Sequence, residues 1–167
     1  GVGKSTLLNL FLGLIHPTKG EIQVDDINIK NNLLSWQSKI GFVPQNIYLL
    51  DESIAKNIAF GFDDKKIDYQ RLSSVIKDSQ LEKFVNDLPN GAETLVGERG
   101  AQISGGQLQR IGIARALYIN PDILIFDEST SSLDNETETK IMETINSIKK
   151  NKTIIFVSHK KNPMKYC

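Results

Sequence analysis

The sequence predicts an α/β protein built on a mostly parallel sheet. Short apolar runs at 40–43, 123–126 and 153–157 alternate with stretches of helical spacing, which is typical of buried parallel strands covered by helices on both faces. A glycine turn opens the first helix, and the strand at 123–126 ends in two adjacent carboxylates, Asp127 and Glu128. A chain of 167 residues suits one such domain, with room for a small appended lobe.

The N-terminal part is expected to contain one helix, one hairpin and one strand. Residues 4–14 predict a helix that glycines open. Residues 21–24 and 27–29 flank two aspartates and predict a β-hairpin. Residues 40–43 predict a short buried strand that Pro44 ends.

The rest of the chain is expected to alternate helices with two strands. Apolar residues recur at helical spacing in 107–118 and 135–149, and 69–87 predicts two short helices. Asp134 stands where an N-cap would lie, and lysines end the last turn of that helix, as the helix dipole favours. The region 54–119 is mostly helical and could form a separate lobe.

Composition argues against several classes of protein. Lysine plus arginine and aspartate plus glutamate each number 20, so the net charge of zero disfavours a generally basic binder of nucleic acids or membrane surfaces. The one cysteine, Cys167, supports neither a disulfide framework nor a Cys/His metal cluster. The longest apolar stretch, 7–15, is too short for a membrane span of about 20 residues. Because the chain opens without a methionine, we expect a fragment of a longer polypeptide.

The first six residues carry a phosphate-binding pattern. Gly1-Val2-Gly3-Lys4-Ser5-Thr6 matches the last part of G-x-x-x-x-G-K-[ST]. Glycines let backbone N–H groups curl around phosphate oxygens, and the helix N-terminus adds partial positive charge. Lys4 would reach the β- and γ-phosphates and the Ser5 hydroxyl would ligate Mg²⁺. The simpler alternative is a glycine turn that starts a helix.

The acidic strand end completes this chemistry. In a protein with a phosphate loop, Asp127 would hold Mg²⁺, usually through water, and Glu128 would orient or deprotonate the attacking water. Two carboxylates beside a triphosphate repel it, so Mg²⁺ and Lys4 are required to offset the charge. Without the phosphate loop, two solvated acids that stop a strand would be the better interpretation.

A second anion site is predicted at the start of the helix at 107–118. Ser104-Gly105-Gly106-Gln107 supplies a hydroxyl, two glycines and a positive helix end, although a plain capped helix start has the same residues. One triphosphate needs only one such loop. A dimer is the economical solution, in which the second site of each copy closes over the nucleotide of its partner.

Taken together, these motifs resemble the ATP-binding domain of ABC transporters over nearly the whole chain. The matching motifs are Gly1–Thr6 (Walker A), Val43-Pro44-Gln45 (Q-loop), Ser104-Gly105-Gly106-Gln107 (signature, after Ile103 in place of the commoner leucine), Ile123–Glu128 (Walker B), Ser131-Ser132-Leu133-Asp134 (D-loop) and Val157-Ser158-His159 (H-loop). Their order and spacing carry the resemblance, more than any motif alone.

The resemblance implies a fold, a nucleotide and a metal ion. The fold is a P-loop NTPase (RecA-like) core with a mostly parallel sheet, a partial antiparallel β subdomain and an α-helical signature subdomain. Residues 1–53 and 120–167 would form the core, and 54–119 the helical subdomain with the signature. The nucleotide would be ATP with Mg²⁺. The strand that feeds the phosphate loop and the aromatic residue that stacks on adenine would lie upstream of residue 1.

The resemblance also assigns roles to single residues. The implied catalytic residues are Glu128, His159, Lys4 and Gln45, and the implied Mg²⁺ ligands are Ser5, Gln45 and Asp127. The implied ATP-binding residues are Gly1, Val2, Gly3, Lys4, Ser5, Thr6, Gln45, Ser104, Gly105, Gly106, Gln107 and Asp134. Simpler alternatives remain: Gln45 as an ordinary loop residue, Asp134 as an N-cap alone, and His159 as a surface histidine after a strand.

Two segments resemble the exporter branch of the family. Residues 94–100 are similar to the exporter X-loop, which makes Glu98 a candidate for coupling to membrane helices; its alternative is an exposed loop carboxylate. Residues 53–61 also look exporter-like, and 45–60 resemble bacterial flippases for lipid-linked sugars. The resemblance implies a second ATP-binding domain as partner, identical or similar, and a transmembrane domain on the same polypeptide. It implies the cytoplasmic face of a membrane, as in the bacterial inner membrane, and no nucleic-acid partner.

Three other functions are weighed against this one. The first is a non-transport ABC ATPase acting on DNA or ribosomes. Chromosome and break-repair relatives insert long coiled coils, but no heptad run lies between Gln45 and Ser104, and excision-repair relatives insert zinc modules, but the only cysteine is Cys167. A regulatory module that binds ATP without hydrolysis is disfavoured by Glu128, His159 and the intact signature. An importer ATPase on its own chain is disfavoured by the X-loop.

Overall fold

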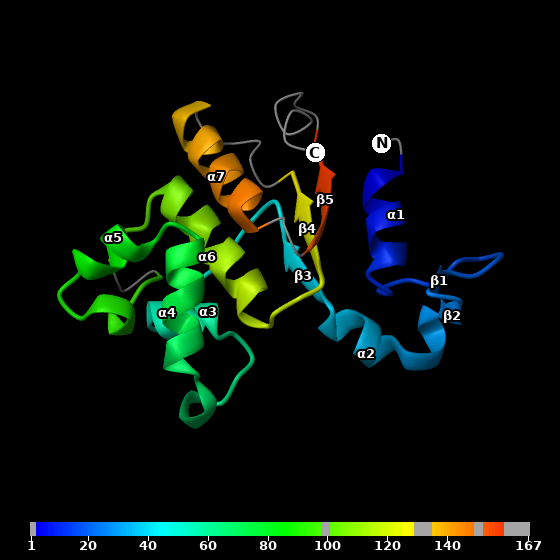
Figure 1. Ribbon diagram of the computed structural model, residues 1–167, viewed down its shortest axis with the longest axis horizontal. Helices are drawn as coiled ribbons and strands as arrows, with labels where there is room; N and C mark the ends of the chain where they lie inside the picture. The colour runs from blue at the N-terminus through cyan, green and yellow to red at the C-terminus, as the bar shows by residue number, and fades with distance from the viewer. Residues whose placement is uncertain (1–2, 98–100, 129–134, 149–151, 159–167) are drawn as a thin grey trace.

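The central feature is a parallel sheet of three strands. The computed structural model describes residues 3–97, 101–128, 135–148 and 152–158. The strands β3 (Ile40–Val43), β4 (Ile123–Asp127) and β5 (Thr153–Val157) lie side by side in that order, all parallel (Figure 1). This arrangement confirms the predicted mostly parallel sheet, with β4 in its middle.

The sheet divides the core into two apolar clusters. Leu124, Ile125 and Phe126 of β4 are fully buried, so this strand has no solvated face. Leu124 and Phe126 belong to the cluster under the larger helices, whereas Ile125 belongs to the cluster under the first helix. Phe126 stacks on Phe156 of β5 with ring centroids 4.9 Å apart. Both faces of β4 are therefore sealed, as the unbroken apolar run 123–126 predicted.

One side of the sheet carries α1 (Lys4–Phe11), α2 (Leu33–Ser38) and a hairpin. The buried indole of Trp36 in α2 donates a 2.7 Å hydrogen bond to the Phe11 carbonyl at the end of α1. It also meets the Phe11 ring edge-on at 5.1 Å. These contacts fix α1 to α2, which leads directly into β3.

The hairpin is shorter than expected. Its strands are β1 (Gln23–Val24) and β2 (Ile27–Asn28), joined by two aspartates that both have positive φ, as a tight two-residue turn requires. The short helix η1 (Ile29–Asn32) leads from β2 into α2. The partial antiparallel part of the predicted fold is this hairpin.

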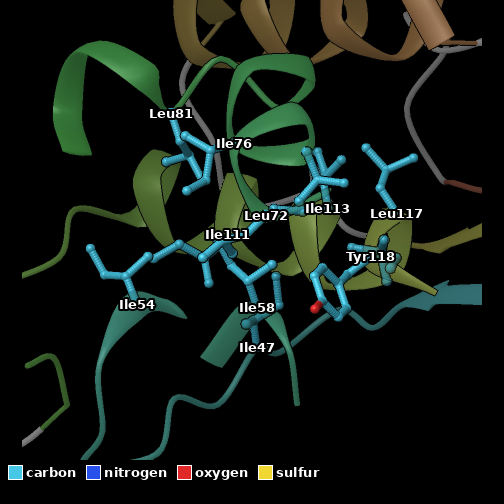
Figure 2. Close-up of a cluster of buried hydrophobic side chains, with 14 of the residues drawn as sticks. Ile47, Ile54, Ile58, Leu72, Ile76, Leu81, Ile111, Ile113, Leu117 and Tyr118 are labelled. Atoms are coloured by element: carbon cyan, nitrogen blue, oxygen red, sulfur yellow. The ribbon is translucent and has the colours of Figure 1, made fainter. Parts of the chain in front are cut away.

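The other side carries the larger helical layer. Its helices are α3 (Ile54–Ile58), η2 (Asp64–Lys66), α4 (Tyr69–Asp78), α5 (Glu82–Asn86), η3 (Gly91–Glu93), α6 (Gly105–Tyr118) and α7 (Asn135–Ile148). The long helix α6 packs on α3, α4 and β3. Figure 2 shows Ile47 and Ile58 below α6 in the view, and Ile76 and Leu81 above it, so α6 is the axis of this layer.

A glycine sets the distance between α6 and the sheet. A Cβ added at Gly41 of β3 would lie 2.6 Å from the Ala116 carbonyl of α6 and 2.8 Å from Leu124. No side chain fits between these backbones. The end of α6 is therefore pressed against the strand that leads to Gln45.

Element boundaries differ from the expectations at a few positions. The first helix ends at Phe11 and not at residue 14, because Gly13 adopts φ +70° and breaks the helix. The helix α6 begins at Gly105, two residues before the predicted start. The predictions of β3, β5 and the two helices within 69–87 are confirmed, whereas α2 was not predicted. Among the described residues, no helix is long and apolar enough to cross a membrane.

Candidate functional site

The candidate site lies where the three parallel strands end. Gln45 follows β3, Asp127 and Glu128 end and follow β4, and Ser158 follows β5. Parallel strands place their carboxyl ends at one edge of a sheet, where ligands of α/β proteins commonly bind. The Glu128 N–H donates a 2.8 Å hydrogen bond to the Val157 carbonyl, so β4 and β5 remain paired up to this edge. Polar residues far apart in the sequence are thus gathered at a single edge.

The phosphate-loop residues form a glycine turn at a helix start. Gly3 has φ +80°, a conformation that glycine adopts without strain, and α1 begins at Lys4. Gly3, Ser5 and Thr6 are exposed. The first N–H groups of an α-helix have no intrahelical acceptor and attract anions. The described part of the predicted loop therefore has the geometry that a phosphate group needs.

Glu128 is held by two other predicted site residues. Its Oε1 lies 3.7 Å from Lys4 Nζ, and the Lys4 and Glu128 side chains are only 32% and 21% exposed. Its Oε2 accepts a 3.3 Å hydrogen bond from Gln45 Nε2. The structure thus brings together Lys4, Gln45 and Glu128 from α1, the loop after β3 and the end of β4.

The Glu128 backbone is also unusual. Its φ of +47° lies in the left-handed region, which costs a non-glycine residue about 1–3 kcal/mol. Strained residues of this kind cluster at functional sites, where the surrounding contacts hold them in place. Here the backbone bond to Val157 and the side-chain contacts to Lys4 and Gln45 hold it.

Asp127 lies in an excess of negative charge. Burial raises the pKa of its carboxyl, the neighbouring Glu128 charge raises that pKa further, and Lys4 lowers it. Such a carboxylate gains from a cation beside it. The donor atoms here are carboxylate, hydroxyl and amide oxygens, which suit Mg²⁺. The described residues contain no group of three or more His, Cys, Asp or Glu that could hold a metal ion.

The Ser-Gly-Gly-Gln segment begins α6 as a capping box. Gln107 N–H donates to Ser104 Oγ at 3.3 Å, and Ser104 N–H donates to Gln107 Oε1 at 2.9 Å. Figure 1 shows α6 on the opposite side of the sheet from α1, so the two predicted anion sites lie on different sides of the molecule. About 18 Å of helix separates Ser104 from the contact of Ala116 with β3, at 1.5 Å per residue.

Several predicted site residues lie outside the described residues. These are Gly1, Val2, Glu98, Asp134 and His159. The structure adds two features that the sequence reasoning missed, the contact between Lys4 and Glu128 and the hydrogen bond from Gln45 to Glu128. No local sequence pattern indicates either contact, because Gln45 and Glu128 are brought together only by the strand order.

An apolar groove of about 400 Å³ separates α1 from β5. Its lining residues are Lys4, Leu7, Leu8 and Phe11 of α1, Ile155, Phe156 and Val157 of β5, and Ser158. Leu7, one of these lining residues, is 69% exposed.

The raised pKa of Asp127 predicts a pH-dependent stability effect. A carboxyl with a raised folded-state pKa contributes stability below its ordinary pKa of 3.8, and that contribution is lost as the pH rises through the raised value. Asp127→Asn should therefore raise the thermal midpoint of the metal-free and nucleotide-free chain at neutral pH. The gain should shrink as the pH falls towards about 4.

The matched control is Asp122→Asn at the other end of β4. Asp122 is exposed and lies 3.9 Å from Lys39, so its substitution should change stability by less than about 0.5 kcal/mol. Thermal melts of both variants at several pH values measure the difference. A neutral-pH midpoint for Asp127→Asn at or below that of the wild type would contradict the charge assignment.

Comparison with known proteins places this geometry in a family. Residues 1–131 match the family model described as ABC transporter. ABC transporter B family member 21 of Arabidopsis thaliana is 42% identical over 161 residues, covering 96% of this chain and 12% of the relative. The ATP-dependent lipid A-core flippase of Bordetella avium is 40% identical, covering 96% and 27%.

A solved structure agrees with this match. The structure of a bacterial Atm1-family ABC exporter with ATP bound has a TM-score of 0.83 and 36% identity, covering 97% of this chain and 28% of that one. The chain thus spans about a quarter or less of the length of these relatives. Given the family match, the parallel sheet and the phosphate-loop helix, the chain belongs to the ABC transporter family and is an ATP-binding domain of that family.

Proposed function

We propose that this chain is the ATP-hydrolysing domain of an ABC exporter and that it powers transport by closing head to tail with a second such domain. The observation that carries the proposal is the position of Glu128. Its carboxylate lies at the end of the central strand, between Lys4 of the phosphate-loop helix and Gln45 of the Q-loop. A general base needs this position beside the terminal phosphate.

ATP binding would begin with an exchange of partners at Lys4. The phosphates would lie against the α1 N-terminus, where the backbone N–H groups from Gly1 to Thr6 and the Lys4 ammonium donate to phosphate oxygens. Lys4 then turns from Glu128 towards the phosphates, and Glu128 is freed to accept a water proton. The contact between Lys4 and Glu128 is partly exposed, so breaking it costs little, about 0–1 kcal/mol.

Charge balance requires a cation at the site. Near a protein surface, like charges about 4 Å apart repel by about 4 kcal/mol, and a triphosphate would face both Asp127 and Glu128. Ser5, Gln45 and Asp127 would hold Mg²⁺ there. When bound, the ion supplies positive charge to the phosphate oxygens and offsets this repulsion.

Hydrolysis itself is a matter of position and proton transfer. Gln45 and Glu128 orient one water in line with the γ-phosphorus, and the Glu128 carboxylate takes a proton from it. The new P–O bond forms as the bond to the β-phosphate oxygen breaks, giving ADP and phosphate. Lys4 and His159 stabilise the charge on the transferred group. Ser104-Gly105-Gly106-Gln107 and Asp134 of a second copy would complete the site.

Removal of the proposed base should separate binding from hydrolysis. Glu128→Gln keeps the size and the hydrogen-bonding capacity of the side chain but cannot accept the water proton. Nucleotide affinity should be retained while phosphate release slows by at least about a hundredfold. Equilibrium nucleotide binding and phosphate-release rates measure the two effects. Lys4→Ala is the contrasting variant, which should weaken binding itself; near-normal turnover of Glu128→Gln would refute the base assignment.

Dimerisation is supported by the separation of the two anion sites. Ser104 begins α6 on the opposite side of the sheet from α1, which fits two copies arranged head to tail better than one copy closing on itself. Each γ-phosphate would then meet the phosphate loop of one copy and Ser104-Gly105-Gly106-Gln107 of the other. The partner is a second copy or a similar domain.

A mixed dimer tests this arrangement. Ser104→Arg placed in one copy should impair the nucleotide site that contains the partner's phosphate loop, because the arginine would enter that site. Its own phosphate loop should retain function. Single-site turnover, with one phosphate loop at a time inactivated by Lys4→Ala, distinguishes the copies. Damage confined to the site with the substituted copy's own phosphate loop would contradict the head-to-tail arrangement.

The exporter assignment is supported by the relatives and by an exposed apolar surface. The relatives include proteins named as flippases and as an exporter. Large apolar side chains stand exposed before and after α3 and at the X-loop entry; they are Tyr48, Leu50, Phe60 and Leu95. Exposed groups of this kind mark surfaces that contact another domain. We infer that membrane helices of the same polypeptide dock here, on the chain that follows Gln45 in the sequence and with Glu98 as a coupling candidate, at the cytoplasmic face of a membrane such as the bacterial inner membrane.

Cell fractionation tests the membrane link. An antibody against this chain should detect a band much larger than 18.7 kDa that leaves the membrane fraction only with detergent. A carbonate wash, which strips peripheral proteins, should leave the band in place. A band near 18.7 kDa in the soluble fraction would contradict fusion to membrane helices and favour separate membrane subunits or a non-transport partner.

A further inference from the structure

Arg115 of the signature helix holds the backbone that follows the Q-loop. Its Nε donates a 2.7 Å hydrogen bond to the Asn57 carbonyl, and both Nη atoms lie 3.2 Å from the Tyr48 carbonyl. Its guanidinium also lies 5.2 Å from the centre of the Phe60 ring. Burial lowers the pKa of this guanidinium, and the bonded carbonyls compensate for the lost water. One side chain of α6 is therefore bonded to two separate points of the segment 48–57.

Asn57 forms further hydrogen bonds within that segment. Its Oδ1 accepts from Arg115 Nη2 at 3.2 Å and from the Leu50 N–H at 2.9 Å. Its Nδ2 donates to the carbonyls of Leu50 at 3.1 Å and Ser53 at 3.1 Å. Asn57 is fully buried, and a satisfied buried network of this kind is rigid.

A second contact joins the same face of α6 to the Q-loop. A Cβ added at Gly112, one turn before Arg115, would lie 2.2 Å from Ile47 Cδ1. Residues three apart on a helix share a face. Ile47 is two residues after Gln45, and Figure 2 shows it close to Ile58 beside α6. Packing at Gly112 and hydrogen bonds from Arg115 thus attach the residues immediately after Gln45 to α6.

The segment 48–57 is also hydrogen-bonded to the residues that lead into the X-loop. The Ile54 N–H donates to the Thr94 carbonyl at 3.1 Å, and the Val96 N–H donates to the Glu52 carbonyl at 3.0 Å. Residues 48–57 therefore connect three regions: α6 with its signature residues, Gln45, and the chain that leads to Glu98. Three of the exposed apolar residues lie in or next to this segment, namely Tyr48, Leu50 and Phe60.

We infer that Arg115 is a positioning residue that makes α6 and the segment 48–57 move as one unit, so that nucleotide contact at the signature end of α6 is passed to the exposed apolar surface. The inference rests on the proposed function, because it supplies the mechanical link between ATP and the membrane domain. Arginine suits the role better than lysine, since its planar fork bonds several carbonyls at once.

Hydrogen–deuterium exchange in the full-length polypeptide tests this link. The Glu128→Gln background holds ATP without hydrolysis, and exchange is followed with and without Mg·ATP in peptides covering 1–11 and 48–57. Mg·ATP should slow exchange in both peptides. Adding Arg115→Lys should leave the response of 1–11 unchanged and reduce that of 48–57 by about threefold or more, in the range of coupling changes from single substitutions.

Arg71→Lys is the matched control. Arg71 also donates from Nη2 to a carbonyl of α6, that of Leu117 at 3.2 Å, and lies 5.8 Å from the Tyr118 ring centre, but it belongs to α4. Its loss should cost similar stability and leave the 48–57 response intact, which separates positioning from folding. Should thermal unfolding show that Arg115→Lys does not fold, Asn57→Ser removes the Oδ1 acceptor with the same expected result.

The possible outcomes are distinct. Equal 48–57 responses in the Arg115→Lys and Arg71→Lys proteins would overturn the link, and so would a Glu128→Gln protein in which Mg·ATP slows exchange in 1–11 alone. No response of 1–11 to Mg·ATP in any of the proteins would overturn the proposed function itself, and the link with it.

Discussion

The burial of β4 on both faces is the constraint on which the rest of the structure depends. Leu124 and Phe126 pack under the helical layer and Ile125 under α1, so neither layer can shift without exposing apolar side chains of this strand. Fully burying each such side chain stabilises the fold by about 1.5–3 kcal/mol. The two residues that follow the apolar run, Asp127 and Glu128, are held at the edge by that burial. The central strand, buried on both faces, therefore carries the two adjacent carboxylates of the candidate site.

Two kinds of polar contact serve different purposes around this strand. Lys4 and Glu128 lie 3.7 Å apart and are partly exposed, so their attraction is small and easily exchanged for a phosphate group. The negative charge of Glu128 raises the pKa of Asp127, so a cation bound beside the two carboxylates would be stabilised by their charge. Arg115, which is half-buried, and Asn57, which is fully buried, form several hydrogen bonds at once, and removing Arg115 takes hydrogen bonds away from the buried Asn57. The contact between Lys4 and Glu128 in the site is therefore easily broken, whereas the contacts of Arg115 and Asn57 between α6 and the segment 48–57 are not.

Much of this arrangement could be predicted from the sequence, because its signals are local. The apolar run at 123–126 and the proline after residue 43 gave β4 and the end of β3, and the aspartate pair at 25–26 gave the hairpin turn. The glycine turn before Lys4 and the capping residues at Ser104 are also local, and both lie at helix starts as expected. The features that the sequence did not predict are a short helix and a contact between residues far apart in the chain. The helix α2 has only six residues, and the hydrogen bond between Gln45 and Glu128 joins positions 83 residues apart.

The positioning contacts of Arg115 and Asn57 are only partly indicated by the sequence. Arg115 is the one charged residue in the apolar helical run 111–117, where a solvated side chain would not be expected, and Asn57 lies beside Lys56 in the short helix 54–58. The periodicity marks Arg115 as an exception, but it cannot name its partners, because most of them are backbone carbonyls that carry no sequence information. Three of the four hydrogen bonds that Arg115 donates go to backbone carbonyls, which a change of side chain in the segment does not remove. The attachment of Tyr48 to α6 therefore runs through its backbone carbonyl, while its side chain stands 81% exposed.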